Sequence, residues 1–246
     1  MSTEETSSCQ VLQLTDSTHR SRAVDALIDG QIIVLAFNGI FVLVGDADDP
    51  RVPEKIAAAK GRPQAKGVAL VCPPEFLAEH VALDDPLMWS TYLFDKIQAL
   101  YGAVHALGLI LPAAIPGAPH HVVQAGTVLN VWTEQEPQSS LRQLVLQLRQ
   151  RGRRALVGTS ANLAGRPTIT DAVEVQVVFS SRVPLILLET FDRVPAQRRH
   201  SASIVDLTEQ TPRLVREGSV TADELRKELR GRQLGELAAG PDVLRV

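Results

Sequence analysis

Short apolar runs alternate with stretches of helical spacing along most of this chain. Runs rich in valine, isoleucine and leucine predict buried strands, whereas apolar residues that recur every three or four positions predict amphipathic helices. The predicted strands cover residues 31–37, 40–44, 68–71, 107–112, 127–131, 155–158, 185–188, 203–207 and 213–216. The predicted helices cover residues 21–29, 53–59, 74–81, 86–101, 141–151, 171–178 and 221–230. This alternation predicts an α/β sheet flanked by helices, with loops that carry the chemistry.

The same pattern suggests the domain boundaries. Residues 1–20 are predicted to form a flexible lead-in, residues 21–230 a single domain and residues 231–246 a C-terminal tail. Inside the domain, Asn38-Gly39 separates two apolar runs. That dipeptide predicts a tight hairpin turn between neighbouring buried strands.

Composition narrows the class of protein. The chain has 246 residues, of which 45% are hydrophobic and 22% charged, as in an ordinary globular protein. Its net charge of −3 excludes a globally basic nucleic-acid-binding protein but leaves a local basic groove open. Two cysteines, Cys9 and Cys72, cannot build a disulfide framework or a four-cysteine metal site. No apolar run approaches the roughly 20 residues of a membrane span, and no signal peptide is visible. We therefore expect a soluble, cytoplasmic protein with no membrane partner, and the oligomeric state stays open.

Three cations lie close together in the loop between a predicted helix and a predicted strand. Lys60, Arg62 and Lys66 stand among glycines and a proline. Glycine lets the backbone approach a ligand closely, and arginine and lysine are the usual pair for phosphate. The loop is therefore a candidate phosphate site. The alternative is a solvent-exposed loop that is merely basic.

A cluster of small polar residues follows the predicted strand at 155–158. Thr159, Ser160 and Asn162 would lie at the end of that strand, which is the usual ligand position in open α/β sheets. Their hydroxyls and amide are candidates for contact with a phosphate or a ribose. The alternative is a turn whose side chains cap the next helix.

The remaining polar residues do not point to a single function. His120 and His121 are adjacent, and no carboxylate stands at ligand spacing, so we expect no metal site built by the protein. The segment 200–203, which ends at Ser203, predicts either a further phosphate-facing turn or an exposed basic loop. The sequence contains neither the Gly-x-Ser-x-Gly elbow of serine hydrolases nor a Walker motif.

Taken in order, these motifs resemble the YrdC/Sua5 family of threonylcarbamoyl-adenylate synthases over roughly residues 23–220. The matching pieces are a turn at 36–38, Lys-x-Arg-Pro…Lys-Gly at 60–67, Thr-Ser-Ala-Asn-x-Ala-Gly-x-Pro at 159–167, Ser-Ile-Val-Asp-Leu at 203–207 and Leu-Val-Arg-Glu-Gly at 214–218. The resemblance implies a twisted mixed α/β sheet with a basic concave face that fits nucleotide and RNA.

The resemblance also implies a nucleotidyltransferase. In such an enzyme, bicarbonate carboxylates an amino acid, the carbamate attacks the α-phosphate of ATP, and pyrophosphate leaves; Mg²⁺ accompanies the ATP. The product would be a carbamoyl-adenylate for transfer to a tRNA adenosine. By the resemblance, Lys60, Arg62 and Ser160 would be catalytic. The implied nucleotide-binding residues are Lys60, Arg62, Lys66, Thr159, Ser160, Asn162, Ser203 and Arg216.

The chain departs from the family pattern on the amino-acid side. Phe37 and Asn38 stand where the family has the threonine and glutamate of a Pro-Thr-Glu turn. Asn130 stands where the family has a strand arginine, and a Pro-Gly-Pro-x-Thr segment is reduced to 101–105, which ends at His105. We expect these residues to mark a rewritten substrate pocket.

Three functions remain open at this point. The first is a divergent enzyme that forms or uses a carbamoyl-adenylate made from another amino acid or amine. The second is threonylcarbamoyl-adenylate synthesis itself, with compensated substitutions. The third is a non-catalytic protein that binds nucleotide or RNA, which the arginines at 149–154 and 193–199 would allow.

Overall fold

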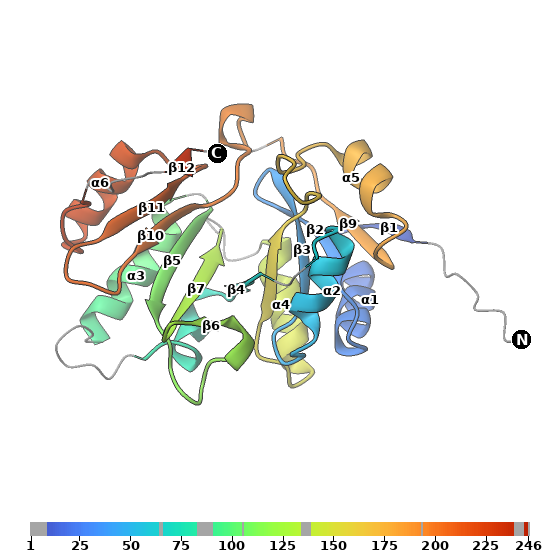
Figure 1. Ribbon diagram of the computed structural model, residues 1–246, viewed down its shortest axis with the longest axis horizontal. Coiled ribbons are helices and arrows are strands. Elements are labelled where there is room, and N and C mark those ends of the chain that lie inside the picture. The colour runs from blue at the N-terminus through green and yellow to red at the C-terminus, as the bar shows by residue number, and fades with distance from the viewer. Residues whose placement is uncertain are drawn as a thin grey trace, which may run out of the picture.

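The computed structural model describes residues 9–63, 66–82, 91–104, 106–133, 139–192, 194–238 and 244–245. The described strands form one mixed, twisted sheet, which confirms the predicted α/β fold (Figure 1). They are β1 (Gln10–Gln13), β2 (Ile33–Phe37), β3 (Ile40–Asp46), β4 (Ala69–Val71), β5 (Leu107–Pro112), β6 (Val123–Gln124), β7 (Thr127–Trp132), β8 (Leu156–Ser160), β9 (Leu185–Leu188), β10 (Ser203–Asp206), β11 (Arg213–Glu217) and β12 (Leu244–Arg245). Their order across the sheet is β1-β9-β2-β3-β8-β4-β7-β5-β10-β11-β12, and β6 pairs with β7 outside this path.

Each predicted helix has a counterpart, but the one predicted over 74–81 is a 3-10 helix and the one predicted over 21–29 begins at Ser17. The helices are α1 (Ser17–Ile28), α2 (Val52–Ala59), α3 (Thr91–Ala103), α4 (Ser140–Gln150), α5 (Ala172–Phe179) and α6 (Ala222–Gly231), with 3-10 turns η1 (Pro74–Glu79), η2 (His120–Val122) and η3 (Ala196–Arg198). Asp16, Ser139, Asp171 and Thr221 each accept a hydrogen bond from a first-turn N–H of the helix that follows. Such caps define where four of the helices begin. The start of the helix predicted over 86–101 falls outside the described residues.

Strands β2 and β3 form the hairpin that Asn38-Gly39 predicts. Asn38 has a φ of 46° and Gly39 a φ of 85°, the left-handed conformation that asparagine and glycine tolerate best. Every residue of both strands is buried, so the hairpin lies in the core of the molecule. Its closed end pairs Phe37 with Ile40.

Helices gather at the two ends of the sheet (Figure 1). Helices α1, α2, α4 and α5 lie around β1, β9, β2 and β3, whereas α3 and α6 lie beside β5, β10 and β11. Helix α2 packs closely on β3 because Gly45 has no side chain; a Cβ there would lie 2.6 Å from methyl carbons of Val52. Strands β8, β4 and β7 join the two ends of the sheet.

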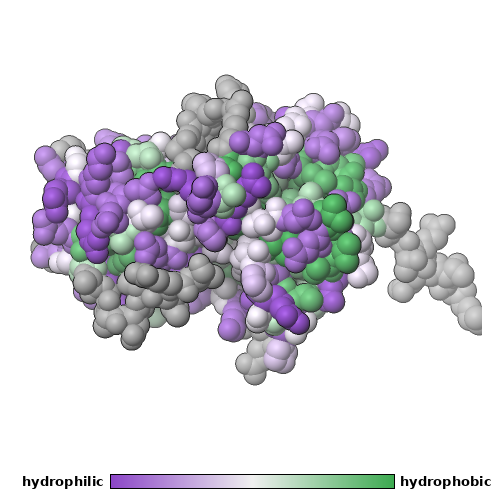
Figure 2. Space-filling view, turned by 90° about the horizontal axis from the view of Figure 1, so that it is seen from above, coloured by the Kyte–Doolittle hydropathy of each residue, from purple (hydrophilic) through white to green (hydrophobic). Residues whose placement is uncertain are grey.

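The hydropathy of the surface differs between the two ends of the sheet (Figure 2). The end that carries α6 is mostly hydrophilic, whereas hydrophobic surface gathers toward the end that carries α5. There Val173 and Val177 of α5 are 68% and 79% exposed. Among the described helices, none is both long and apolar enough to span a bilayer.

Both segments that the pattern assigned to a lead-in and a tail contribute to the sheet. Residues 10–13 form β1, which pairs in parallel with β9, and Leu12 and Leu14 are buried. Beyond α6, Leu234 and Leu237 are buried, and β12 pairs with β11. An edge strand of 4 residues has too few apolar positions to stand out in the sequence.

Candidate active site

A cavity of about 230 Å³ lies over the central strands of the sheet. Residues of β2, β3, β8, β4, β7, β10 and β11 line it, together with segments that immediately precede β4 and β10. The polar side chains of the lining are Thr159, Ser160, Ser201 and Arg216. Its larger apolar side chains include Phe37, Ile40, Val42, Leu129, Val131 and Ile204. The cavity therefore has a polar portion and an extensive apolar portion.

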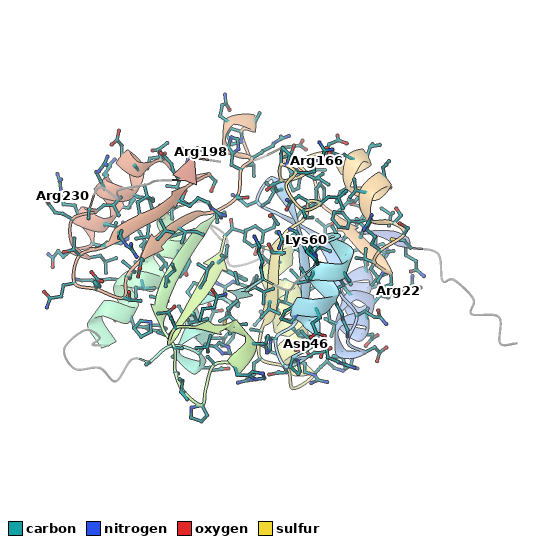
Figure 3. The ribbon with its side chains drawn as sticks, viewed as in Figure 1. Arg22, Asp46, Lys60, Arg166, Arg198 and Arg230 are labelled. Carbon is teal, nitrogen blue, oxygen red and sulfur yellow. The ribbon has the colours of Figure 1, made fainter. Side chains whose placement is uncertain are left out.

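Lys60 forms hydrogen bonds beside this cavity with Ser160 and Asn162, two residues of the polar cluster at the end of β8. Its Nζ donates to the backbone oxygen of Ser160 at 2.5 Å, across 100 positions of the chain, and to Oδ1 of Asn162 at 2.8 Å. The hydroxyl of Ser160 donates to the same Asn162 oxygen at 2.9 Å. The backbone N–H of Ala164 donates to the Lys60 carbonyl at 3.0 Å. Figure 3 shows Lys60 near the middle of the molecule, at the end of α2.

The burial of Lys60 changes its acid–base behaviour. Only 1% of the residue is exposed. Burial, with a smaller contribution from the neighbouring Arg62 cation, lowers the pKa of Lys60 to about 7. An anion placed beside Nζ would favour the charged form and raise this pKa again. Lys60 is therefore poised to take up a proton when an anionic ligand arrives.

Thr159 and Ser160 belong to strand β8 and not to the predicted loop. Strand β8 continues to Ser160, which lies opposite Val42 of β3. Pairing with β3 therefore holds both hydroxyl residues where they line the cavity. Asn162 follows in a turn, where its Nδ2 donates to the carbonyls of Leu163 and Arg166. The alternative interpretation, in which these side chains cap the next helix, is wrong, because the side chain of Asp171 caps α5.

Arg216 brings a positive charge to the cavity from β11. Its Nε and Nη2 donate to the carbonyl of Ala202 at 3.0 and 2.6 Å. Burial lowers the pKa of Arg216, and among the described residues no carboxylate forms an ion pair with it. A partly buried cation without a carboxylate partner is a natural binding point for an anionic ligand.

Ser203 does not line the cavity. It is fully buried, and its hydroxyl donates to the Val220 carbonyl at 2.6 Å and accepts from the N–H groups of Gly218 and Val220. Its neighbours Ala202 and Ile204 line the cavity, and side chains alternate along a strand. The predicted nucleotide contact of Ser203 is therefore replaced by a structural role in the connection after β11.

The rest of the basic loop lies at the margin of the site. Arg62 is half-buried and Lys66 is exposed, and neither is among the described residues that line the cavity. Gly67, at the end of the loop, does line it. The loop therefore reaches the cavity through its backbone at Gly67.

The four residues predicted for the substrate pocket have different outcomes. Phe37 lines the cavity, and His105 lies outside the described residues. Asn38 is half-buried beside the cavity lining, and its Nδ2 is buried without a hydrogen-bond partner among the described residues. Asn130 is fully buried.

Asn130 faces away from the cavity. Its side chain accepts from the N–H of Cys72 at 3.1 Å and donates to the Cys72 carbonyl at 3.2 Å and to the Tyr101 hydroxyl at 3.1 Å. Leu129 and Val131, its neighbours on β7, line the cavity instead. The prediction that places Asn130 in the substrate pocket is corrected by this geometry, because strand alternation turns its amide into the core.

The family model Sua5/yciO/yrdC, described as "Telomere recombination", matches residues 25–218 of this chain. The chain belongs to this family. A curated protein of Mycobacterium tuberculosis, named provisionally as a threonylcarbamoyl-AMP synthase, is 27% identical over 222 residues, covering 88% of this chain and 93% of the relative. The threonylcarbamoyl-AMP synthase of an Enterobacter species is 26% identical over 174 residues, covering 71% of this chain and 86% of the relative.

A solved structure supports the fold of this Sua5/YciO/YrdC family member. The crystal structure of Pyrococcus abyssi Sua5 in complex with L-threonine has a TM-score of 0.72 and 18% identity to this chain. The match covers 96% of this chain but 66% of the Pyrococcus protein. At this identity the likeness establishes the fold, and the ligand is a property of the Pyrococcus protein.

The arginines at 149–154 of this family member are neutralised within the molecule. Arg149 pairs with Glu79, Arg151 with Asp25, Arg153 with Asp46 and Arg154 with Asp48. Figure 3 shows Asp46 at an edge of the molecule far from Lys60. In the described lining of the cavity, Arg216 is the one cationic side chain. Among the described residues, no group of three or more His, Cys, Asp or Glu side chains could hold a metal ion.

The prediction from sequence missed the apolar lining of the cavity. Leu129, Val131 and Ile204 lie in predicted strands, and in the sequence their polar neighbours Asn130 and Ser203 draw the attention instead. Pairing the predicted strands in the correct order would have been needed to find them, and the sequence does not contain that order explicitly.

Proposed function

We propose that this protein binds ATP with Mg²⁺ and forms a carbamoyl-adenylate from bicarbonate and an amino acid or amine. The observation that carries the proposal is the junction of Lys60 with Ser160 and Asn162 at the edge of a cavity that also contains Arg216. Cations and small hydroxyl groups of this kind suit a polyphosphate and its developing charge. Family membership gives this chemistry its precedent.

The proposed reaction proceeds in two steps. Bicarbonate first carboxylates the amine, and water is lost. An oxygen of the resulting carbamate then attacks the α-phosphorus of ATP, and the bond to the β-phosphate oxygen breaks to release pyrophosphate. Lys60 and Arg62 would neutralise the phosphates with support from Lys66, Arg216 would hold the adenylate, and Ser160 and Asn162 would position the reacting groups. Mg²⁺ would arrive on the ATP oxygens, since it usually binds through substrate phosphates and a few carboxylates.

L-Threonine is a second candidate for the amine. The relatives in Mycobacterium and Enterobacter carry the name threonylcarbamoyl-AMP synthase, and the Pyrococcus relative was crystallised with L-threonine. Against it stands Phe37, whose ring replaces a hydroxyl in the cavity lining. A non-catalytic RNA-binding role has less support, because the arginines at 149–154 are paired with carboxylates.

Pyrophosphate release tests the proposal. Protein, ATP, Mg²⁺ and bicarbonate are incubated with no amine, with L-threonine, and with a panel of other amino acids. We expect amine-dependent release that falls at least a hundredfold in the Lys60→Ala plus Arg62→Ala variant, because the phosphates lose two cations. The matched control is Arg226→Ala plus Lys227→Ala, which removes the same two residue types from the exposed face of α6.

Release with L-threonine alone would assign the second candidate. ATP binding without release for any amine would contradict the enzymatic proposal and favour a binding protein. ATP binding that is unaffected in the Lys60→Ala plus Arg62→Ala variant would contradict the assignment of the phosphate site.

A further inference from the structure

A second cavity, of about 350 Å³, lies on the opposite face of the β2–β3 hairpin from the candidate active site. Phe41 of β3 lines this second cavity, whereas its neighbours Ile40 and Val42 line the active-site cavity. Successive side chains of a strand point to opposite faces, so the hairpin separates the two cavities. In the part of the chain that the structure describes, the two linings have no residue in common. The volume of the second cavity is typical of a site for a small molecule.

Distant segments of the chain build the second cavity. The end of β1, the β2–β3 hairpin, the start of α5, residues 188–192 and Arg199 contribute to its lining. Gln13 of β1 lies opposite Leu188 of β9, so both side chains point to the same face of the sheet. Figure 1 shows α5 beside β9 and β1 at this end of the sheet. The cavity is therefore shaped by paired strands and does not depend on a single loop.

An aromatic ring forms the apolar wall of the second cavity. The ring of Phe191 packs on the ring of Phe41 with 5.2 Å between centroids and 56° between planes. Phe41 is fully buried, whereas Phe191 is half-buried and lines the cavity. Phe41 therefore supports the Phe191 ring from beneath, and part of the Phe191 ring stays accessible. Such a wall suits an apolar group, and an aromatic group best of all.

Charged groups of both signs line the second cavity without neutralising one another. Glu189 and Asp192 contribute carboxylates, and Arg199 contributes a guanidinium group. Among the described residues, none of these three groups forms an ion pair. Arg199 instead donates from Nε to the Val194 carbonyl at 3.0 Å and from Nη2 to the Phe191 carbonyl at 3.1 Å. These bonds hold the guanidinium group in place and leave its Nη1 for a ligand.

The Glu189 carboxylate is also held in place. Its Oε1 accepts a hydrogen bond from the hydroxyl of Ser140, the first residue of α4, at 2.8 Å. Within the described part of the chain, its Oε2 has no hydrogen-bond partner. Glu189 and Arg199 are both half-buried, so a charged ligand between them would be partly shielded from water. Hydrogen bonds between charged groups are stronger in such surroundings.

We propose that the second cavity binds a free α-amino acid with an apolar side chain. Its ammonium group would bind Glu189 and Asp192, its carboxylate would bind Arg199, and its side chain would pack on the Phe191 ring. A ligand with a single charge would leave a charged group of the cavity without a partner, which is unfavourable. The inference goes beyond the proposed function and does not depend on it, because it concerns the other face of the hairpin and involves no nucleotide.

Three ligands that share a phenyl group test the need for both charges. Titration calorimetry measures the binding of L-phenylalanine, phenethylamine and 3-phenylpropanoate to the full chain without ATP, Mg²⁺ or bicarbonate. Phenethylamine lacks the carboxylate, and 3-phenylpropanoate lacks the ammonium group. We expect L-phenylalanine to bind about ten- to a hundredfold more tightly than either analogue, because each analogue loses hydrogen bonds between charged groups. No binding of L-phenylalanine, or equal binding of either analogue, would overturn the inference.

Conservative substitutions locate the ligand. Glu189→Gln plus Asp192→Asn removes both negative charges, and a glutamine carbonyl can still accept the hydrogen bond from Ser140. The affinity for L-phenylalanine should fall at least tenfold. The matched control is Glu174→Gln plus Asp223→Asn, which removes the same residue types from exposed positions of α5 and α6 outside the cavity and should leave the affinity unchanged. Thermal unfolding verifies that each variant folds. Unchanged affinity in the cavity variant, or an equal loss in both variants, would contradict the inference.

The active-site variant separates the two proposals. Lys60→Ala plus Arg62→Ala should lose pyrophosphate release and keep its affinity for L-phenylalanine. If L-phenylalanine binding is lost in this variant and retained in Glu189→Gln plus Asp192→Asn, the ligand occupies the active site and the inference is wrong. If the unmodified protein releases no pyrophosphate with any amine but binds L-phenylalanine through Glu189 and Asp192, the proposed function fails and the second site stands.

Discussion

Lys60 is enclosed by the molecule instead of extending into solvent as loop lysines usually do. Its ammonium group bridges the Ser160 carbonyl and the Asn162 amide, two groups that the chain supplies from a separate motif. An exposed lysine keeps a pKa near 10.4, whereas burial lowers the pKa of Lys60 to about 7. At neutral pH, the charge on this residue therefore depends on what binds beside it.

Nucleotide binding should be linked to protonation of Lys60. At pH 8 the free protein holds Lys60 mostly neutral, and the phosphates of ATP should raise its pKa and draw in up to about one proton. Titration calorimetry at pH 8 in buffers of different ionisation enthalpy measures this uptake. The Lys60→Met variant should show none, whereas Lys227→Met, which replaces an exposed lysine on α6, should retain it. The same proton uptake in Lys60→Met and in the unmodified protein would rule out Lys60 as its source.

At the scale of elements, strand β8 positions two of the polar residues that line the cavity, Thr159 and Ser160. Its middle residue, Gly158, lies opposite Val44 of β3. A Cβ there would lie 2.5 Å from the Leu43 carbonyl oxygen and 2.8 Å from a Val44 methyl carbon. Because the first contact is with backbone, it cannot be relieved by rotating a side chain. The close approach of β8 to β3 thus depends on glycine at this position.

Gly158→Ala should destabilise the protein and disturb the site together. We expect the free energy of unfolding in urea to fall by about 1–3 kcal/mol, the usual cost of overpacking in a core. ATP affinity should also fall, because Thr159 and Ser160 follow Gly158 directly. Gly231→Ala is the matched control: it lies at the end of α6 with nothing within 4 Å of its Cβ position, and it should be neutral or slightly stabilising. Unchanged stability of Gly158→Ala would contradict the close packing of β8 on β3.

At the scale of the whole molecule, His80 links folding to pH. The residue is fully buried after η1, and neither ring nitrogen has a hydrogen-bond partner among the described residues. Burial lowers the pKa of His80 to about 4, and the Arg154 and Arg149 cations reinforce this while Glu79 and Asp48 oppose it. Since the unfolded chain binds a proton near pH 6.5, the stabilising effect of the neutral ring is complete above that pH. It is lost as the pH falls toward 4.

Acid should therefore destabilise the protein through His80. Between pH 7 and pH 4, linkage predicts a loss of about 3 kcal/mol from this residue. The measurement compares urea unfolding of the unmodified protein and of His80→Leu across this range, so that contributions from other groups cancel in the difference. The stability of His80→Leu relative to the unmodified protein should rise as the pH falls. A difference that stays constant with pH would show that His80 does not protonate in this range on unfolding.

Much of the fold could be predicted from local pattern. The hairpin at Asn38-Gly39, strand β9 and the Thr221 cap of α6 were all predictable, because each depends on residues adjacent in the chain. The edge strand β1 was not predictable, because it pairs with β9, which lies far along the sequence. Local spacing carries no information about a partner so distant in the chain.

The candidate site likewise contains residues that the sequence identifies and residues whose position only the folded sheet decides. Lys60, Ser160 and Asn162 were identifiable because lysines, hydroxyls and amides are conspicuous beside apolar strands. Asn130 was conspicuous for the same reason, yet the direction of its side chain was decided by the pairing of β7 with β4 and β5. A shift by one residue exchanges the two faces of a strand, so residue type alone cannot show which face a polar side chain occupies.

The sequence by itself determined the α/β class, most element boundaries and the family, and it supplied the residues that we propose for the phosphate side. These depend on composition and on spacing within short stretches of chain. The tertiary structure alone decided which side chains share the cavity: the pairing of β7, β5, β10 and β11 brought Val131, Ile204 and Arg216 together and turned Asn130 and Ser203 away. The physical reason is that burial and strand register are properties of the assembled sheet, and four separate strands must pair before these side chains meet.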